Sequence, residues 1–176
     1  TVQRQRCVNI AVLATAGSTL THLVINALHN FYGLLPVNIY NIFMITVPFL
    51  IPRLHRYGEN VAAIALGVLV LFGHTFVVWS FGLESDLQVY FTMFASGLLL
   101  LLGVQHWRLF LVFFVLYLAG LLIVLQYAPV AGWLIPEDEQ FRELLSRQAM
   151  INTYAITTGL LFYALTLRRR AEELNK

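Results

Sequence analysis

Residues 7 to 30, CVNIAVLATAGSTLTHLVINALHN, decide the fold of this chain. The stretch contains no Asp, Glu, Lys or Arg, and it exceeds the roughly 20 apolar residues that a helix needs to cross a bilayer. Its second half nevertheless carries His22, Asn26 and His29 at the i, i+4, i+7 spacing of one helical face. Ionisable side chains within a membrane helix usually face a protein interior or a cavity. This polar face is therefore the first candidate for a functional site.

The composition of the whole chain extends the same interpretation. Hydrophobic residues make up 59% of it and charged residues only 11%, far below the roughly 25% of a typical soluble domain. The first charge-free stretch is long enough for two membrane helices, and each of the others is long enough for one. These stretches are residues 7–52, 60–83, 87–107, 109–136 and 148–167. The sequence therefore predicts an all-α, polytopic membrane protein built as a bundle of six transmembrane helices.

The helices are expected at residues 7–29, 36–51, 60–81, 87–104, 109–127 and 149–167. Pro36 suits the first turn of the second helix, and Pro48 should kink that helix near its inner end. The fifth helix is almost purely Leu, Val and Phe, which predicts a largely lipid-facing position. Residues 1–167 would form one membrane domain.

Two features surround the last helix. Pro136-Glu137-Asp138-Glu139 is typical of a helix N-terminus, and Phe141, Leu144 and Leu145 then form an apolar stripe suited to a helix on the membrane surface. Beyond residue 167 the sequence RRRAEELNK favours helix, so we expect residues 168–176 to continue the last helix into the cytoplasm.

The basic residues predict the orientation. If the N-terminus is cytoplasmic, only Arg142 and Arg147 lie outside, and all other basic residues lie inside: Arg4, Arg6, Arg53, Arg56, Arg108, Arg168, Arg169, Arg170 and Lys176. Basic residues accumulate on the cytoplasmic side of membrane proteins. Both termini are therefore expected in the cytoplasm, with the chain in a bacterial inner membrane and its surface in contact with lipid.

Polar residues of several predicted helices fall at one depth. Counting 1.5 Å per residue from the inner charged flank of each helix places them at roughly 18 to 24 Å, in the outer half of the membrane. They are His22, Asn38, Asn41, His74 and Asn152. Thr15, Ser18 and Thr19 extend the stripe of the first helix inward, and Asn26, Tyr90 and Tyr154 are further candidates for the same wall.

Three interpretations of this polar layer remain open. It could be a pocket for a small signal molecule with one polar group, with asparagine and tyrosine fixing its orientation. It could be a haem b or metal centre, since His22 and His74 on different helices could approach an iron from opposite faces. His29 lies about 10 Å further out, so it would serve a second metal site or simply meet water. The polar groups could also only join helices through hydrogen bonds.

Other functional classes find little support. No nucleophile–histidine–acid arrangement and no glycine-rich phosphate loop is present, so this stretch is not expected to be an enzyme. Formal charges lie at predicted helix ends or in loops, which disfavours an ion pathway. The basic residues are explained by orientation and anionic lipid, without nucleic acid. Cys7 is the single cysteine, so an internal disulfide is excluded.

Two short motifs carry a resemblance to a known family. Gly73-His74-Thr75-Phe76 is followed by Gly82-Leu83-Glu84-Ser85-Asp86, and the last helix runs into Arg168-Arg169-Arg170-Ala171-Glu172-Glu173-Leu174. This pattern resembles the six-helix membrane anchors of bacterial class III adenylate cyclases, and a related module occurs in quorum-sensing receptor kinases. The resemblance marks His74, Glu84 and Ser85. It implies a sensory module, as a homodimer, whose last helix signals to a C-terminal cytoplasmic cyclase domain that makes cAMP; the alternative is a passive dimerising anchor.

Overall fold

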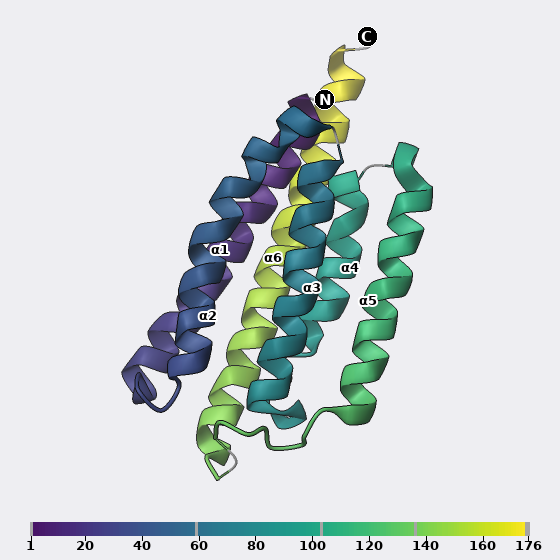
Figure 1. Cartoon of the computed structure of the whole chain (residues 1–176). Coiled ribbons are helices and arrows are strands. Elements are labelled where there is room, and N and C mark those ends of the chain that lie inside the picture. Colours follow the sequence, from purple (N-terminus) through teal and green to yellow (C-terminus); the bar gives the residue numbers. More distant parts are fainter. Residues whose placement is uncertain (1, 59, 103, 136, 175–176) are drawn as a thin grey trace.

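The computed structural model describes residues 2–58, 60–102, 104–135 and 137–174. Over these residues the chain is helical, and its long helices pack side by side in one bundle (Figure 1). They are α1 (Val2–Asn30), α2 (Leu35–Thr46), α3 (Val61–Phe81), α4 (Val89–Leu102), α5 (Trp107–Tyr127) and α6 (Glu139–Leu174). The 3₁₀ segments η1 (Val47–Tyr57), η2 (Leu83–Ser85) and η3 (Val104–His106) connect some of them. The predicted all-α fold is confirmed.

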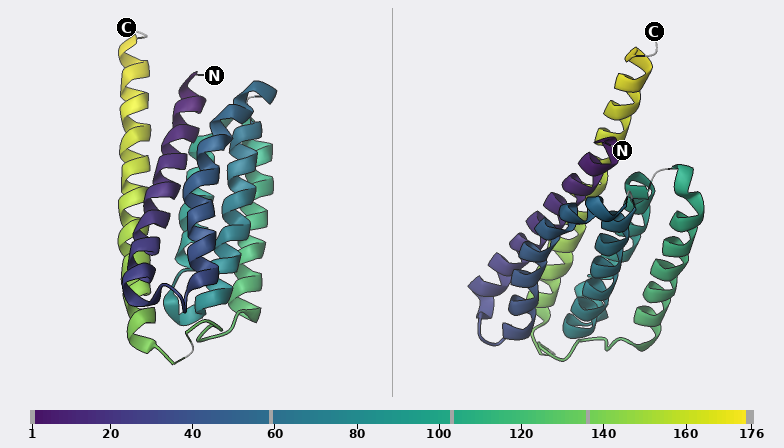
Figure 2. Two further views of the ribbon diagram at one scale, coloured as in Figure 1. Left: turned by 60° about the vertical axis from the view of Figure 1, so that its left-hand side comes forward. Right: turned by 45° about the horizontal axis from the view of Figure 1, so that its top comes forward.

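Four segments of the described chain are long and apolar enough to cross a membrane. They are Gln5–Asn30, Leu35–Tyr57, Val61–Phe81 and Trp107–Tyr127. The chain is therefore a membrane protein, as predicted. α4 and α6, which were also predicted to span, lie alongside these segments in all views (Figures 1 and 2).

The second predicted helix changes its winding at a proline. Pro36 lies in the first turn of α2, as expected. The α-helix ends at Thr46, however, and the chain continues as η1 through Pro48 and Pro52 to Tyr57. Prolines lack the N–H that an α-helix requires, so Pro48 and Pro52 favour a change of winding here, although a 3₁₀ segment of 11 residues is unusually long. The helical rod thus continues to Tyr57, beyond the predicted end of the second helix at residue 51.

The start of α6 corrects another expectation. Phe141, Leu144 and Leu145 do not form a separate surface helix, because they belong to the first turns of the 36-residue α6. Phe141 and Leu145 are buried, at 2% and 0% exposure. The backbone N–H of Phe141 donates to Oδ1 of Asp138 at 2.9 Å, which caps the helix. Pro136, Asn175 and Lys176, named in the expectations for this region, lie outside the described residues.

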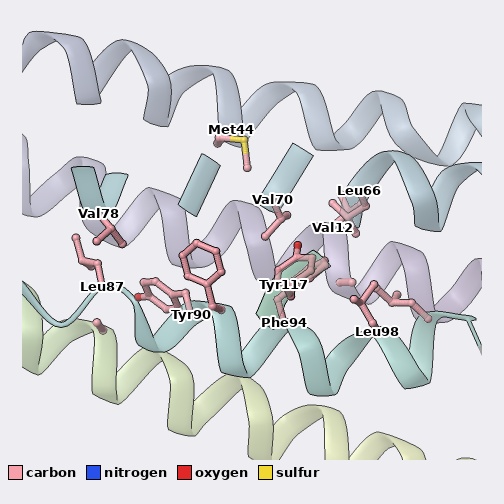
Figure 3. Close-up of a cluster of buried hydrophobic side chains, with 14 of the residues drawn as sticks. Val12, Met44, Leu66, Val70, Val78, Leu87, Tyr90, Phe94, Leu98 and Tyr117 are labelled. Carbon is pink, nitrogen blue, oxygen red and sulfur yellow. The ribbon is translucent and has the colours of Figure 1, made fainter. Parts of the chain in front are cut away.

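The core lies between α1, α2, α3 and α4 (Figure 3). It includes Val12 of α1, Met44 of α2 and Phe94 of α4, all at most 7% exposed. α5 adds few buried side chains and exposes many apolar ones, so its predicted outward position is confirmed. Phe113 and Tyr117 of α5 are the large exceptions, and the Tyr117 hydroxyl donates to the carbonyl of Gly67 at 2.8 Å.

Polar contacts fasten the beginning of α6 to the turn between α3 and α4. A guanidinium nitrogen of Arg142 lies 2.9 Å from Oε2 of Glu84, and the hydroxyl of Ser146 donates to Oδ2 of Asp86 at 2.7 Å. The backbones of Gly82 and Gly132 meet closely here at positive φ values of +83° and +72°. A side chain at either glycine would collide with backbone, so this junction sets where α6 enters the bundle.

Candidate functional site

A partly open cavity of about 90 Å³ runs along one face of α1. Its walls come from α1, α2, α3, α4 and α6, and α5 takes no part. On α1 the lining begins at Cys7 and ends at Asn26, which at 1.5 Å per residue corresponds to roughly 28 Å of helix. The predicted stripe of Thr15, Ser18 and Thr19 lies within it. The polar face of the first helix therefore turns toward the interior of the bundle.

The structure brings five of the predicted site residues to this cavity. They are His22 and Asn26 from α1, Asn41 from α2, His74 from α3 and Tyr90 from α4. By their positions within the helices, all lie nearer to the end of the bundle where α1 ends at Asn30 and α3 ends at Phe81. Four helices thus contribute their polar side chains to one interior space at a common depth.

Tyr90 connects the histidines of the cavity to α6. Its hydroxyl is hydrogen-bonded to Nε2 of His22 at 2.7 Å, and it accepts a hydrogen bond from Nδ2 of Asn152 at 3.1 Å. The ring of His74 stacks on the ring of Tyr90, with centroids 5.4 Å apart and an interplanar angle of 21°. Asn152 also donates to Oγ of Ser18 at 3.0 Å. Helices α1, α3, α4 and α6 therefore meet around one tyrosine.

Several polar atoms at the cavity have no hydrogen-bond partner among the described residues. Asn26 is fully buried, and both Nδ2 and Oδ1 of its amide lack a partner. Two further buried nitrogens also lack a hydrogen-bond partner among the described residues: Nδ2 of Asn41 and Nδ1 of His74. Asn41 is 3% exposed. Leaving a buried polar group unpaired typically costs about 1–3 kcal/mol. Such atoms gathered at one cavity are what a binding site for a polar group would present.

The other predicted site residues lie elsewhere. Asn38 is buried and donates to the carbonyl of Phe31 at 2.9 Å, so it holds the α1–α2 turn. Tyr154 is 75% exposed on the outside of α6 and does not line the cavity, contrary to the prediction. Asn152 does not itself line the cavity, but its amide donates to two residues that do, Tyr90 and Ser18. The orientation of a residue around α6 depends on its packing, which sequence spacing does not reveal.

His29 contacts the start of α6 and does not line the cavity. Its Nε2 lies 2.8 Å from Oδ2 of Asp138, and its ring stacks on Phe141 with centroids 3.9 Å apart. Across the part of the chain that the structure describes, no three His, Cys, Asp or Glu side chains gather as a metal site would require. The second metal site considered for His29 therefore finds no support among these residues.

The histidine pair also fits haem poorly in this arrangement. Axial ligation needs Nε2 or Nδ1 of both imidazoles aimed at one iron. Nε2 of His22 is instead hydrogen-bonded to Tyr90, whose ring also covers His74. No carboxylate lines the cavity among the described residues. Haem ligation by both histidines stays a prediction, and it would require the Tyr90 side chain to move away from His22 and His74.

Sequence reasoning missed several residues of the wall. Tyr40, Met44, Met93 and Phe94 all line the cavity. Each stands in an apolar helix, where an aromatic side chain or methionine gives no signal of an interior cavity. Tyr40 lies next to Gly73, one residue before His74, and an added Cβ at Gly73 would collide with the Tyr40 hydroxyl. Gly73 itself was the available sequence signal, because a glycine within a membrane helix allows close contact with a neighbouring helix.

The motif Gly82-Leu83-Glu84-Ser85-Asp86 lies at the end of the bundle and does not line the cavity. Ser85 is buried, and its hydroxyl donates to the carbonyl of Gly82 at 2.6 Å. Glu84 and Asp86 hold the start of α6 through Arg142 and Ser146. The motif thus shapes the junction between the α3–α4 turn and α6.

Comparisons with known proteins give the family. The family model MASE7 matches residues 1–176, the whole chain. A search among curated proteins finds no match. An apolar helical bundle with a polar interior cavity agrees with a sensory role at a membrane. The chain belongs to MASE7, a family of membrane-associated sensor domains.

Proposed function

We propose that this sensor domain receives a small-molecule signal in the cavity and passes it through α6 to a cytoplasmic output domain. The observation that carries the proposal is the position of Tyr90, which contacts both cavity histidines and hydrogen-bonds Asn152 of α6. A ligand that displaces His22 or His74 must disturb Tyr90. That disturbance reaches α6 directly, because the side-chain amide of Asn152 donates a hydrogen bond to the Tyr90 hydroxyl.

The length of α6 supports its role in transmission. It is one continuous helix of 36 residues, roughly 54 Å long. Its C-terminal part extends beyond the neighbouring helices in all views (Figures 1 and 2). Its first turns are fastened by Arg142 and Ser146, as described above. A helix held at one end and touched by Tyr90 in its middle can transmit a rotation or a shift to whatever follows it.

We further propose six spans with both termini in the cytoplasm of a bacterial inner membrane. The N-terminus, the C-terminal part of α6, η1 and the α4–α5 connection lie at the same end of the bundle (Figure 1). That end carries Arg6, Arg53, Arg56, Arg108 and Arg169. The opposite end carries only two arginines, Arg142 and Arg147, among the described residues, and acids that include Glu84 and Asp138. This distribution follows the positive-inside rule.

The output domain is proposed from the resemblance to the anchors of class III adenylate cyclases. In that case the domain is not itself catalytic, acts as a homodimer, and regulates the formation of cAMP by the cyclase domain that follows α6. The direct test inserts one to four residues after residue 167 in the full-length protein and measures cAMP formation. Transmission through a continuous helix predicts activity that varies with helical phase. A smooth decline with insert length would contradict transmission through α6.

The rival proposal is a passive anchor that only brings two output domains together. The two proposals differ at Tyr90. In a passive anchor, Tyr90→Phe would leave cyclase activity and its response to membrane extract unchanged. In a sensor, the variant loses its bonds to His22 and Asn152, and we expect the response to fall at least fivefold. Asn9→Leu, an exposed change on α1, is the matched control.

Haem is tested separately by absorption spectroscopy of the protein purified with added haemin. Because Tyr90 occupies Nε2 of His22, we expect no haem spectrum that depends on the histidines. A Soret band lost in both His22→Ala and His74→Ala would contradict this expectation. That result would make the domain a redox or gas sensor.

A further inference from the structure

The cavity has a polar end and an apolar end. The atoms without partners, which belong to Asn26, Asn41 and His74, lie at the end away from the chain termini. Toward the other end the lining includes Ala14, Leu101 and Leu160, with few polar groups. The two ends are separated by most of the roughly 28 Å length of α1 that lines the cavity. A ligand that matches both ends is long and has its polar group at one tip.

We propose that the cavity binds a neutral, single-chain amphiphile whose head carries a carbonyl group together with an N–H or O–H donor. The inference rests on the sensory role proposed above. Nδ2 of Asn26 and Nδ2 of Asn41 supply donors for the ligand carbonyl. Oδ1 of Asn26 supplies an acceptor for the ligand N–H or O–H. The head thereby satisfies amide atoms that are otherwise unpaired in a dry environment.

The head has to be uncharged. No Asp, Glu, Lys or Arg lines the cavity among the described residues. A carboxylate or ammonium buried there would lack a compensating charge, and such burial is expensive. A neutral amide or hydroxy-carbonyl group needs only hydrogen bonds, which Asn26 and Asn41 are placed to provide.

The tail occupies the crevice beside α1 and α6. The cavity of about 90 Å³ has room for a small head group, and it is partly open. Several partly exposed lining residues lie on α1 and α6, among them Ala14, Ile156 and Leu160. α6 packs more extensively on α4 than on α1, so the interface between α1 and α6 is the looser of the two. An alkyl chain can lie along it while the head stays inside.

Recognition should depend on the head far more than on the tail. Lipid acyl chains are as apolar as this crevice, so moving an alkyl tail from the bilayer into it gains little free energy. The hydrogen bonds of the head are made only in the cavity. Ligands compared at equal mole fraction in the bilayer should therefore rank by head chemistry.

The experiment measures equilibrium binding of tritiated dodecanamide to the protein in lipid nanodiscs. Dodecane, which lacks the head, and dodecanoate, which is charged at pH 8, are compared at equal mole fraction. We expect saturable binding of the amide, none of dodecane, and at least tenfold weaker binding of dodecanoate. Stronger binding of dodecanoate would overturn the neutral head, and equal binding of dodecane would overturn the role of the head.

Two variants locate the ends of the ligand. Asn26→Leu should weaken dodecanamide binding about tenfold, or about 1.4 kcal/mol, whereas Asn9→Leu on the exposed side of α1 should leave it unchanged. Ala14→Phe should fill the crevice and weaken dodecanamide while leaving the short butanamide unaffected. Equal loss of both amides would show that the tail does not lie there, and unchanged binding in Asn26→Leu would overturn the site.

Failure of this inference is distinguishable from failure of the proposed function. No saturable binding of dodecanamide overturns the ligand class. The helical-phase experiment on α6 needs no knowledge of the ligand, so it judges the sensory role by itself.

Discussion

Replacing Asn26 with leucine should make the ligand-free protein more stable. Asn26 is 0% exposed, and neither amide atom has a partner among the described residues. Each unpaired buried polar group typically costs about 1–3 kcal/mol, so the two atoms together set an upper limit of about 6 kcal/mol. The unfolded state in a membrane also finds partners for polar groups, which reduces the difference substantially. We therefore expect a gain of about 1–2 kcal/mol.

The assay is reversible unfolding by SDS in mixed detergent micelles, after exchange into fresh detergent to remove co-purified lipid. Asn9→Leu changes the same residue type on the exposed side of α1, and its effect should stay within about 0.5 kcal/mol. A loss of 1 kcal/mol or more in Asn26→Leu would refute the reasoning, because it would mean that the amide is well paired in the folded protein. A gain would show that the domain sacrifices stability at its binding site.

Three further changes test the junctions around the site by the same unfolding assay. Tyr90→Phe removes a hydroxyl with two hydrogen bonds and should cost about 1 kcal/mol, since such bonds in membranes average about 0.6 kcal/mol; no loss would mean that these bonds do not form. Gly82→Ala should cost at least about 2 kcal/mol, because its Cβ would collide with backbone at positive φ, whereas Gly17→Ala meets open space and should be neutral or stabilising by up to about 1 kcal/mol. Arg142→Met removes the contact with Glu84 and a bond to the carbonyl of Ile135 and should cost about 1–3 kcal/mol; an effect below about 0.5 kcal/mol would contradict the described junction.

The sequence predicted the helices and one face of the site well. A charge-free stretch of membrane length has few alternatives to helix, so the predicted and observed bounds of α3 differ by one residue. The i, i+4 spacing of His22 and Asn26 placed both on the face of α1 that lines the cavity. Both features depend on residues close together in the chain, and composition and residue spacing are sufficient to predict such features.

The failures depend on contacts between distant segments. Residues near Arg142 had the pattern of a surface helix, and the contacts with Glu84 and with the carbonyl of Ile135 explain why this arginine is 6% exposed inside the bundle. Tyr90 and Tyr154 were both predicted to line the site, yet one is 6% and the other 75% exposed. Their positions around α4 and α6 follow from helix packing, which a single sequence does not specify.

The most direct measurement is a density map of the protein, taken from its own membrane into nanodiscs, at a resolution that shows bound small molecules. The account predicts elongated non-protein density that contacts the Asn26 amide beside His74 and follows α1 toward Ala14. A map in which the Asn26 amide is bonded to protein neighbours, with no density in the cavity, would contradict it.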